Sequence, residues 1–239
     1  MSLNTQMKAL KHAVEAGALP SVVGAFGRAE MALRQSGILE RALRAGERMP
    51  EFTLPDTRAR AVALARLLLR GPVVVSFYRG DWCDYCAMEL AALTAIHDQV
   101  KGLGATLIGI SPQAPEARIR CDAPEPPFPL LFDAGAKLAR RCRIAFADSD
   151  ELRPIYTAAG RRPLPGVHDS WLLPLPATYV VDWTGEVVFS HVNTDYTNRL
   201  EPADIITVVA HLARRMDRKR PHRVRRAASQ SAARRHASE

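Results

Sequence analysis

The strongest constraint on the fold is an apolar, mostly β-branched run at 73–78 that ends shortly before two cysteines, Cys83 and Cys86. A short run that is apolar on both faces is typical of a buried strand in a parallel sheet. From Ala87 to about Lys101, apolar residues recur at helical spacing. The pattern therefore predicts a strand, a short connection carrying Cys-x-x-Cys, and a helix with Cys86 in its first turn.

The same periodicity arguments give the remaining elements. Further strands are expected at 105–111 and 129–132 and in a hairpin, 177–182 and 186–191, that turns at Gly185. Helices are expected twice within 3–45, at 134–147, 151–159 and 202–215, with a short helix or turn at 61–69. The segments 46–56 and 161–176 are expected to be extended and irregular, respectively. This order predicts an α/β fold with a central mixed β-sheet flanked by helices.

Charge separates the end of the chain from the rest. The formal net charge of +8 lies entirely within 214–239, whereas residues 1–213 sum to zero. We therefore expect an N-terminal helical extension (1–45), one central domain (46–216) and a basic, disordered C-terminal tail (217–239). The tail is interpreted either as a solubilising extension or as a weak nucleic-acid contact, without aromatics on which bases could stack.

Composition excludes several classes of protein. The chain is 47% hydrophobic and 24% charged, which excludes disorder throughout. No apolar run approaches the roughly 18 residues of a membrane helix, and the N-terminus lacks the apolar core of a signal peptide. A cytoplasmic location with no membrane contact is therefore expected. Neither a phosphate-binding glycine loop nor a carboxylate pair is evident, so no cofactor is expected.

Cys83 and Cys86 are the candidate reactive groups. Unpaired N–H groups and the positive end of a helix dipole favour thiolate over thiol at a helix N-terminus. Arg79 would add positive charge, and Trp82 would shield one side from water. The spacing lets the two sulfurs close a small disulfide ring, so an oxidised thiol has a resolving partner.

Two other interpretations of the cysteines were weighed. A zinc site needs four ligands, and Cys121 and Cys142 are isolated from the pair and from each other. The other interpretation is that the two cysteines only pack in the core, but Cys-x-x-Cys at a strand–helix junction favours redox chemistry. Cys142 is expected in the core, and Cys121 is a weaker candidate for an alternative resolving thiol.

The chain resembles the peroxiredoxin-like family, the branch of thioredoxin-fold redoxins grouped with alkyl hydroperoxide reductase and thiol-specific antioxidant proteins. The resemblance covers about residues 46–212. It rests on GERMPEFTLPD, FYRGDWCDYCAMEL, LGATLIGISPQ, FPLLFD and LPLPATYVVDWTGEVVFSHVNTDYTNR, which occur in this order. It implies a thioredoxin-like fold.

Two templates within this resemblance assign the cysteines differently. The orthodox peroxiredoxin pattern places the peroxide-reacting cysteine at Cys86 and its accompanying glutamate at Glu89. Cys83 then replaces a threonine and Arg79 a proline, and the arginine that usually activates the peroxide falls near Pro176.

The thioredoxin pattern instead matches Trp82-Cys83-Asp84-Tyr85-Cys86 to Trp-Cys-x-x-Cys. Cys83 is then the exposed attacking thiolate and Cys86 the resolving thiol. Pro176 matches the cis-proline that faces the disulfide, although an X-Pro bond is cis in only about 5–6% of folded cases. A carboxylate at Asp84 would oppose thiolate formation.

These observations predict a thiol-dependent antioxidant oxidoreductase that reduces hydroperoxides and is re-reduced by a thioredoxin-like or other dithiol system. The alternative is a thioredoxin-like disulfide oxidoreductase without significant peroxidase activity, and an interaction module acting through the basic tail belongs to a third class. The expected site comprises Cys83, Cys86, Arg79, Trp82 and Pro176. A homodimer is a further expectation.

Overall fold

The computed structural model describes residues 1–115, 125–159 and 171–219. In chain order its elements are α1 (Leu3–Gly17), α2 (Pro20–Gln35), α3 (Ile38–Arg41), β1 (Thr53–Pro55), β2 (Ala61–Ala63), α4 (Leu64–Leu68), β3 (Val73–Phe77), α5 (Asp84–Gly102), β4 (Thr106–Ser111), β5 (Leu130–Phe132), the 3-10 turn η2 (Ala134–Ala136), α6 (Lys137–Arg141), β6 (Ala145–Ala147), α7 (Leu152–Ala158), β7 (Leu172–Pro174), β8 (Ala177–Val181), β9 (Val187–Val192) and α8 (Pro202–Lys219).

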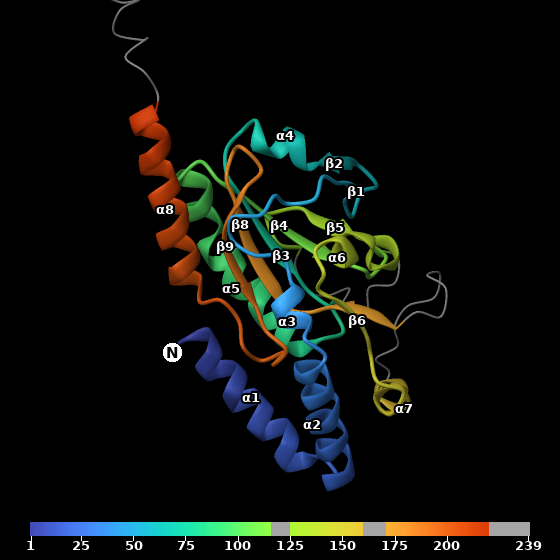
Figure 1. The fold of residues 1–239 in the computed structure, drawn as a ribbon. Coiled ribbons are helices and arrows are strands. Elements are labelled where there is room, and N and C mark those ends of the chain that lie inside the picture. The colour runs from blue at the N-terminus through green and yellow to red at the C-terminus, as the bar shows by residue number, and fades with distance from the viewer. Residues whose placement is uncertain (116–124, 160–170, 220–239) are drawn as a thin grey trace, which may run out of the picture.

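The centre of the fold is a five-stranded mixed sheet in the order β5-β4-β3-β8-β9 (Figure 1). β3 pairs in parallel with β4, and β4 with β5, whereas β8 runs antiparallel to both of its neighbours. Every residue of β3 is buried, as expected for an apolar strand in the middle of a covered sheet. The predicted thioredoxin-like α/β fold is confirmed.

Alternation of side chains along the strands divides the core between the two faces of the sheet. Val74 and Val180 join the cluster beneath α5 and α8, which pack together on one face. Val75, Phe77 and Tyr179 point to the other face, where the larger cluster includes residues of α3, α4 and α6. Both faces are therefore covered by helices.

The N-terminal helices α1 and α2 extend beyond one end of the sheet (Figure 1). α1 contacts α5, and α2 contacts α7. Their buried residues, including Met7 and Ala25, belong to a third apolar cluster that also contains Trp82, Cys83 and Tyr156. The predicted helical extension is thus packed against the strand–helix junction that carries the cysteines.

The single helix expected at 134–147 is wrong. Gly135 and Arg143 adopt positive φ angles of 67° and 60°, which an α-helix does not accommodate. Only η2 and the short α6 form, and β6 follows. β6 pairs with β7, a strand that lies within the segment expected to be irregular.

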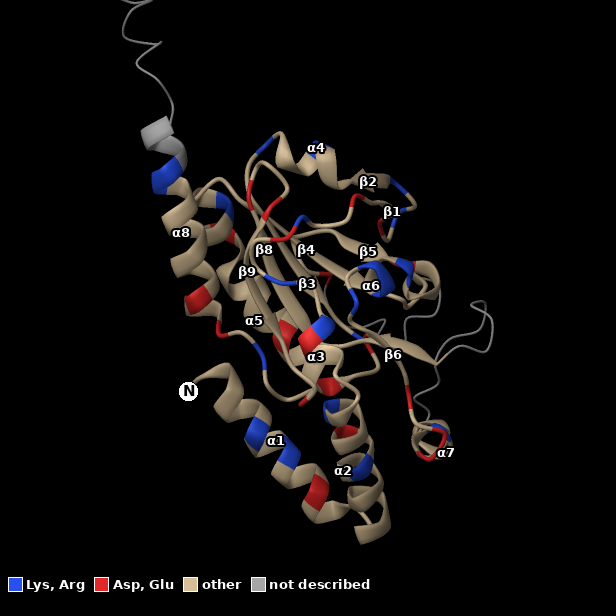
Figure 2. Ribbon diagram, in the orientation of Figure 1, with Lys and Arg blue, Asp and Glu red and all other residues tan. Residues whose placement is uncertain are grey.

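The C-terminal half otherwise follows the predicted pattern. The β8–β9 hairpin turns at Gly185, whose φ of 87° favours glycine. α8 continues to Lys219, beyond the end expected near Arg215, and most of the basic tail lies outside the described residues. Acidic and basic residues are interspersed over the described elements, in agreement with the zero net charge of 1–213 (Figure 2). Among the described residues, no helix is both long and apolar enough to cross a membrane.

Candidate active site

Cys83 occupies the N-cap position of α5, directly after the connection that leaves β3. Its backbone is extended, with φ −94° and ψ 113°, and its Sγ accepts a hydrogen bond of 3.4 Å from the N–H of Cys86. A side-chain acceptor here satisfies one of the N–H groups that a helix start leaves unpaired. The predicted position of both cysteines at the helix N-terminus is confirmed.

Arg79 lies beside Cys83 and is held from several sides. Its Nη2 donates to Cys83 Sγ at 3.1 Å, and its Nη1 donates to the Tyr156 hydroxyl at 3.3 Å. The guanidinium carbon lies 5.2 Å from the ring centroid of Trp82 and 5.0 Å from that of Tyr196. Burial raises the pKa of Tyr156 to about 12, so its hydroxyl is neutral and can accept this bond.

A second buried arginine, Arg199, lies beside the other cysteine. Its Nη1 donates to Glu89 Oε2, its Nη2 lies 3.7 Å from Cys86 Sγ, and its Nε donates to the Tyr196 carbonyl at 2.9 Å. Burial raises the pKa of Glu89, although the positive charge of Arg199 opposes that shift. Each of the two thiols therefore has a guanidinium next to it.

The surroundings of the two thiols shift their pKa values in opposite directions. Burial acts to raise the pKa of Cys83, but the hydrogen bond from Cys86, the charges of Arg79 and Arg199 and the Cys86 N–H outweigh it, and the pKa falls well below its usual range. Burial and the neighbouring Cys83 thiolate raise the pKa of Cys86 well above its usual range. The surroundings of Cys83 therefore favour its thiolate, and those of Cys86 favour the protonated thiol.

The expectation that Cys83 is the exposed thiol is wrong. Both thiols are buried, Cys83 with 1% of its surface exposed and Cys86 with none. The N-terminal extension reaches this site, since residues of α1 and α2, among them Lys11 and Val22, line a cavity of about 70 Å³ together with Cys83.

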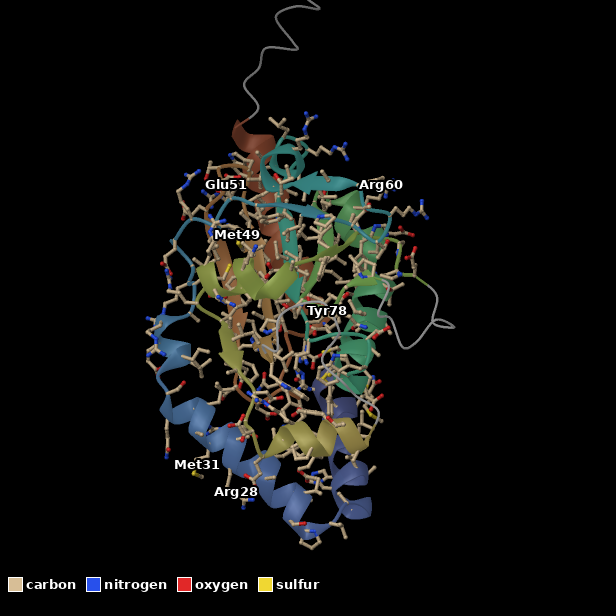
Figure 3. All side chains as sticks on the ribbon, turned by 90° about the vertical axis from the view of Figure 1, so that its right-hand side faces the viewer. Arg28, Met31, Met49, Glu51, Arg60 and Tyr78 are labelled. Atoms are coloured by element: carbon tan, nitrogen blue, oxygen red, sulfur yellow. The ribbon has the colours of Figure 1, made fainter. Side chains whose placement is uncertain are left out.

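A larger cavity of about 550 Å³ lies between α2, α3, β6 and α7 and reaches Arg79. We call Phe26, Tyr156 and Tyr196 the aromatic wall, because these three residues line both cavities. Phe26 meets the other two rings edge-on, at centroid distances of 5.7 and 6.3 Å. In Figure 3, Arg28 and Met31 mark α2, which borders the larger cavity, and Tyr78 marks the start of the connection that follows β3.

Trp82 packs in the same apolar cluster as Cys83, in agreement with the shielding expected of it, whereas Pro176 differs from its expectation. Trp82 is buried, and its ring faces Arg79 and Tyr156. The match of Pro176 to a cis-proline is wrong, because its peptide bond is trans, the isomer that X-Pro bonds prefer. The pairing of Phe77 with Ala177 brings Pro176 to the end of β3, where it lines the larger cavity together with Arg79.

The other two cysteines separate clearly. Cys142 is fully buried in the main core, as expected, and burial raises the pKa of its thiol to about 12. Cys121 lies outside the described residues. Among those that the structure describes, no group of three His, Cys, Asp or Glu side chains is placed to hold a metal ion.

Sequence reasoning left several site residues unassigned. Arg199 and Tyr196 lie in DYTNR, which the sequence singles out only as part of the resemblance, and Tyr156 and Phe26 carry no signal beyond an ordinary amphipathic pattern. Glu89 was noted only through the resemblance. Glu89 lies on α5 itself, whereas the other four residues reach the site from segments that the sequence alone does not place next to α5.

The fold and the site define a thioredoxin-fold protein with a buried dithiol at a strand–helix junction. The chain belongs to the AhpC/TSA family, since the sequence profile of that family matches residues 45–190, more than half of the chain. The predicted peroxiredoxin-like membership is thereby confirmed. Most of the N-terminal extension, and also Arg199, lie outside the matched residues.

Similar proteins agree with this assignment. The chain is 32% identical over 109 residues to chloroplastic peroxiredoxin Q of Sedum lineare, covering 45% of this chain and 58% of that protein. It is 36% identical over 96 residues to chloroplastic peroxiredoxin Q of Oryza sativa subsp. japonica, covering 40% and 44%. The matched segments thus span between 44% and 58% of the length of these relatives.

Solved structures share the fold. The crystal structure of peroxidoxin BcpB from Mycobacterium tuberculosis superposes with a TM-score of 0.52 at 22% identity, covering 71% of this chain and 97% of that one. A structure of peroxiredoxin Q from Xanthomonas campestris gives a TM-score of 0.52 at 17% identity, covering 71% and 99%.

Proposed function

We propose that the protein is a thiol-dependent peroxidase in which Cys83 attacks the hydroperoxide and Cys86 resolves the product. The observation that carries the proposal is the hydrogen bond of 3.1 Å from Arg79 to Cys83 Sγ, at the N-terminus of α5. Charge and helix N–H groups there favour the thiolate, which is the nucleophilic form.

The reaction balances within the dithiol. The Cys83 thiolate bonds to one peroxide oxygen, the O–O bond breaks, and the alkoxide or hydroxide that leaves takes a proton from water. Cys83 is then a sulfenic acid. The Cys86 sulfur displaces its hydroxyl, which leaves as water with the thiol proton, and a Cys83–Cys86 disulfide forms. An external dithiol reduces this disulfide with two electrons.

Stopped-flow kinetics test the peroxidase step. The reduced protein is mixed with hydrogen peroxide and separately with an alkyl hydroperoxide, and loss of thiol is followed for the wild type, Cys83→Ser and Cys86→Ser. We expect rapid loss in the wild type, a single sulfenic acid in Cys86→Ser and no fast phase in Cys83→Ser. Oxidation no faster than that of free cysteine would refute the proposal. A fast phase that persists in Cys83→Ser and is lost in Cys86→Ser would make Cys86 the attacking thiol and Cys83 the resolving one.

The second candidate is a thioredoxin-like disulfide oxidoreductase. It is favoured by the pair of thiols itself, since a low-pKa cysteine followed by a protonated one in Cys-x-x-Cys suits disulfide exchange as well. The burial of Cys83, with 1% of its surface exposed, does not separate the two candidates, because a protein reductant in the peroxidase cycle has to reach the same pair of sulfurs as a protein disulfide would. Trapping a mixed disulfide with a protein substrate through Cys83, in Cys86→Ser, would support this candidate.

The remaining expectations extend this proposal. A hydroperoxide is the substrate, a thioredoxin-like or other dithiol protein the reductant, and a homodimer the assembly. The nucleic-acid contact concerns the tail, which falls largely outside the described residues, and the cytoplasmic location stays a prediction. Retention on DNA at low salt, compared with a variant lacking 217–239, tests the contact.

A further inference from the structure

The start of α1 is joined to the backbone of Arg199, almost 200 residues further along the chain. The Asn4 side chain makes both bonds: its Oδ1 accepts from the Arg199 N–H at 2.8 Å, and its Nδ2 donates to the Arg199 carbonyl at 2.7 Å. One amide thus satisfies both backbone polar groups of a buried residue. Such two-point pairing restrains position and orientation together.

Glu201 holds Asn4 in place for this pairing. Its carboxylate accepts the N–H of Leu3 at 3.0 Å, the N–H of Asn4 at 2.9 Å and the Nδ2 of Asn4 at 2.7 Å. Burial acts to raise the pKa of Glu201, but these hydrogen bonds dominate and lower it. The first turn of α1 is therefore anchored to the segment that follows β9, and Arg199 lies at the anchor point.

The side chain of Arg199 extends from this anchored backbone into the active site. Its guanidinium bonds Glu89 and approaches Cys86, and its charge lowers the pKa of Cys83 and opposes the rise at Cys86. Coulomb interactions in a buried site depend strongly on distance. A displacement of the Arg199 backbone would therefore change the pKa of both thiols.

We propose that Asn4 is a positioning residue of the active site, which acts by fixing the backbone of Arg199 and so holds the Arg199 guanidinium beside Glu89 and Cys86. Because both residues lie outside the segment 45–190 that matches the family profile, the N-terminal extension adds this function to the domain that the profile covers. The inference deepens the proposed function and rests on it only for the rate of peroxide reduction.

The test compares Asn4→Ala with a matched control, Gln6→Ala. Gln6 lies two residues further along the same helix, is exposed, and its amide donates to the Met1 carbonyl. The readout is the pH dependence of iodoacetamide alkylation at Cys83 in the fully reduced protein, with the modified residue identified by mass spectrometry. Thermal unfolding of each variant is measured in parallel.

In Asn4→Ala we expect the pH midpoint of Cys83 alkylation to rise and the rate below that midpoint to fall by about 2- to 30-fold. Gln6→Ala should leave both unchanged. A lower melting temperature with an unchanged alkylation profile would overturn the proposal, because it would assign Asn4 a merely structural role. Should Asn4→Ala not fold, Asn4→Ser removes the amide that pairs with both backbone groups of Arg199, adds no charge, and must shift the midpoint in the same direction.

The alkylation readout involves no peroxide. Failure of the proposed peroxidase activity would leave the midpoint shift measurable, whereas failure of the present inference would leave peroxide reduction intact in Asn4→Ala. The two results are therefore distinguishable.

Discussion

Arg79 donates a hydrogen bond to the sulfur of Cys83 from only four residues earlier in the chain, and both side chains are buried. The short connection between β3 and α5 places them together, while Trp82 and Tyr196 enclose the guanidinium. A buried cation next to a helix N-terminus makes this sulfur the most strongly activated of the described cysteines.

Replacing Arg79 by Gln should raise the pKa of Cys83, because the variant loses the positive charge and the charge-assisted hydrogen bond. Such a bond contributes about 1.5–3 kcal/mol, which corresponds to roughly a 10- to 150-fold loss of thiolate at a pH below the midpoint. Alkylation of Cys83 as a function of pH measures the loss. Arg214→Gln, an exposed arginine on α8, is the control. Equal profiles for the two variants would contradict the role of Arg79.

The stability of the reduced protein should depend on the ionisation of Cys83. Its pKa is lower in the folded than in the unfolded chain, so this contribution is fully present above the unfolded pKa and is lost as the pH falls through the folded pKa. Urea midpoints across this window should decline toward acid more steeply in the wild type than in Cys83→Ser. Parallel pH profiles would show that the thiolate is not stabilised by folding.

Replacing Glu89 by Gln leaves the Arg199 charge buried without a counter-ion. We expect a loss of about 3 kcal/mol in the free energy of unfolding, because breaking a buried ion pair from one side is costly. Urea denaturation measures the loss. The matched control is Glu47→Gln, which breaks an exposed pair with Arg143 and should cost about 0–1 kcal/mol. A similar loss in both variants would mean that the buried pair of Glu89 and Arg199 contributes no more to the free energy of unfolding than an exposed pair does.

The aromatic wall should limit which reagents reach Cys83. Phe26→Ala removes the ring that meets Tyr156 and Tyr196 edge-on. Because this ring lines both cavities, its removal should connect them. We expect the reaction with a bulky aromatic disulfide reagent to accelerate more than the reaction with iodoacetamide. Met31→Ala, at an exposed position on the same helix, is the control and should leave the ratio of the two rates unchanged. A constant ratio in Phe26→Ala would place the access route elsewhere.

The local part of the fold and the site follows from the sequence. The apolar run at 73–78 and the helical spacing after Ala87 were enough to predict β3, α5 and a dithiol at their junction. Arg79 lies within the same short segment, so its proximity to Cys83 is a matter of chain connectivity. The segment at 134–147 could not be predicted correctly, because the positive φ angle at Arg143 and the pairing of β6 with β7 depend on the surrounding structure.

The sequence by itself thus determined the thioredoxin-like core and where the reactive thiols lie along it. Only the tertiary structure decided which thiol has surroundings that favour the thiolate, that both thiols are buried, and that Arg199 and the N-terminal helices lie at the site. The physical reason is the range of the interactions. Strand pattern, helix start and Cys-x-x-Cys are local, whereas Arg199 is 113 residues from Cys86 and 195 from Asn4, and these residues meet only when burial of the shared apolar core brings their elements together.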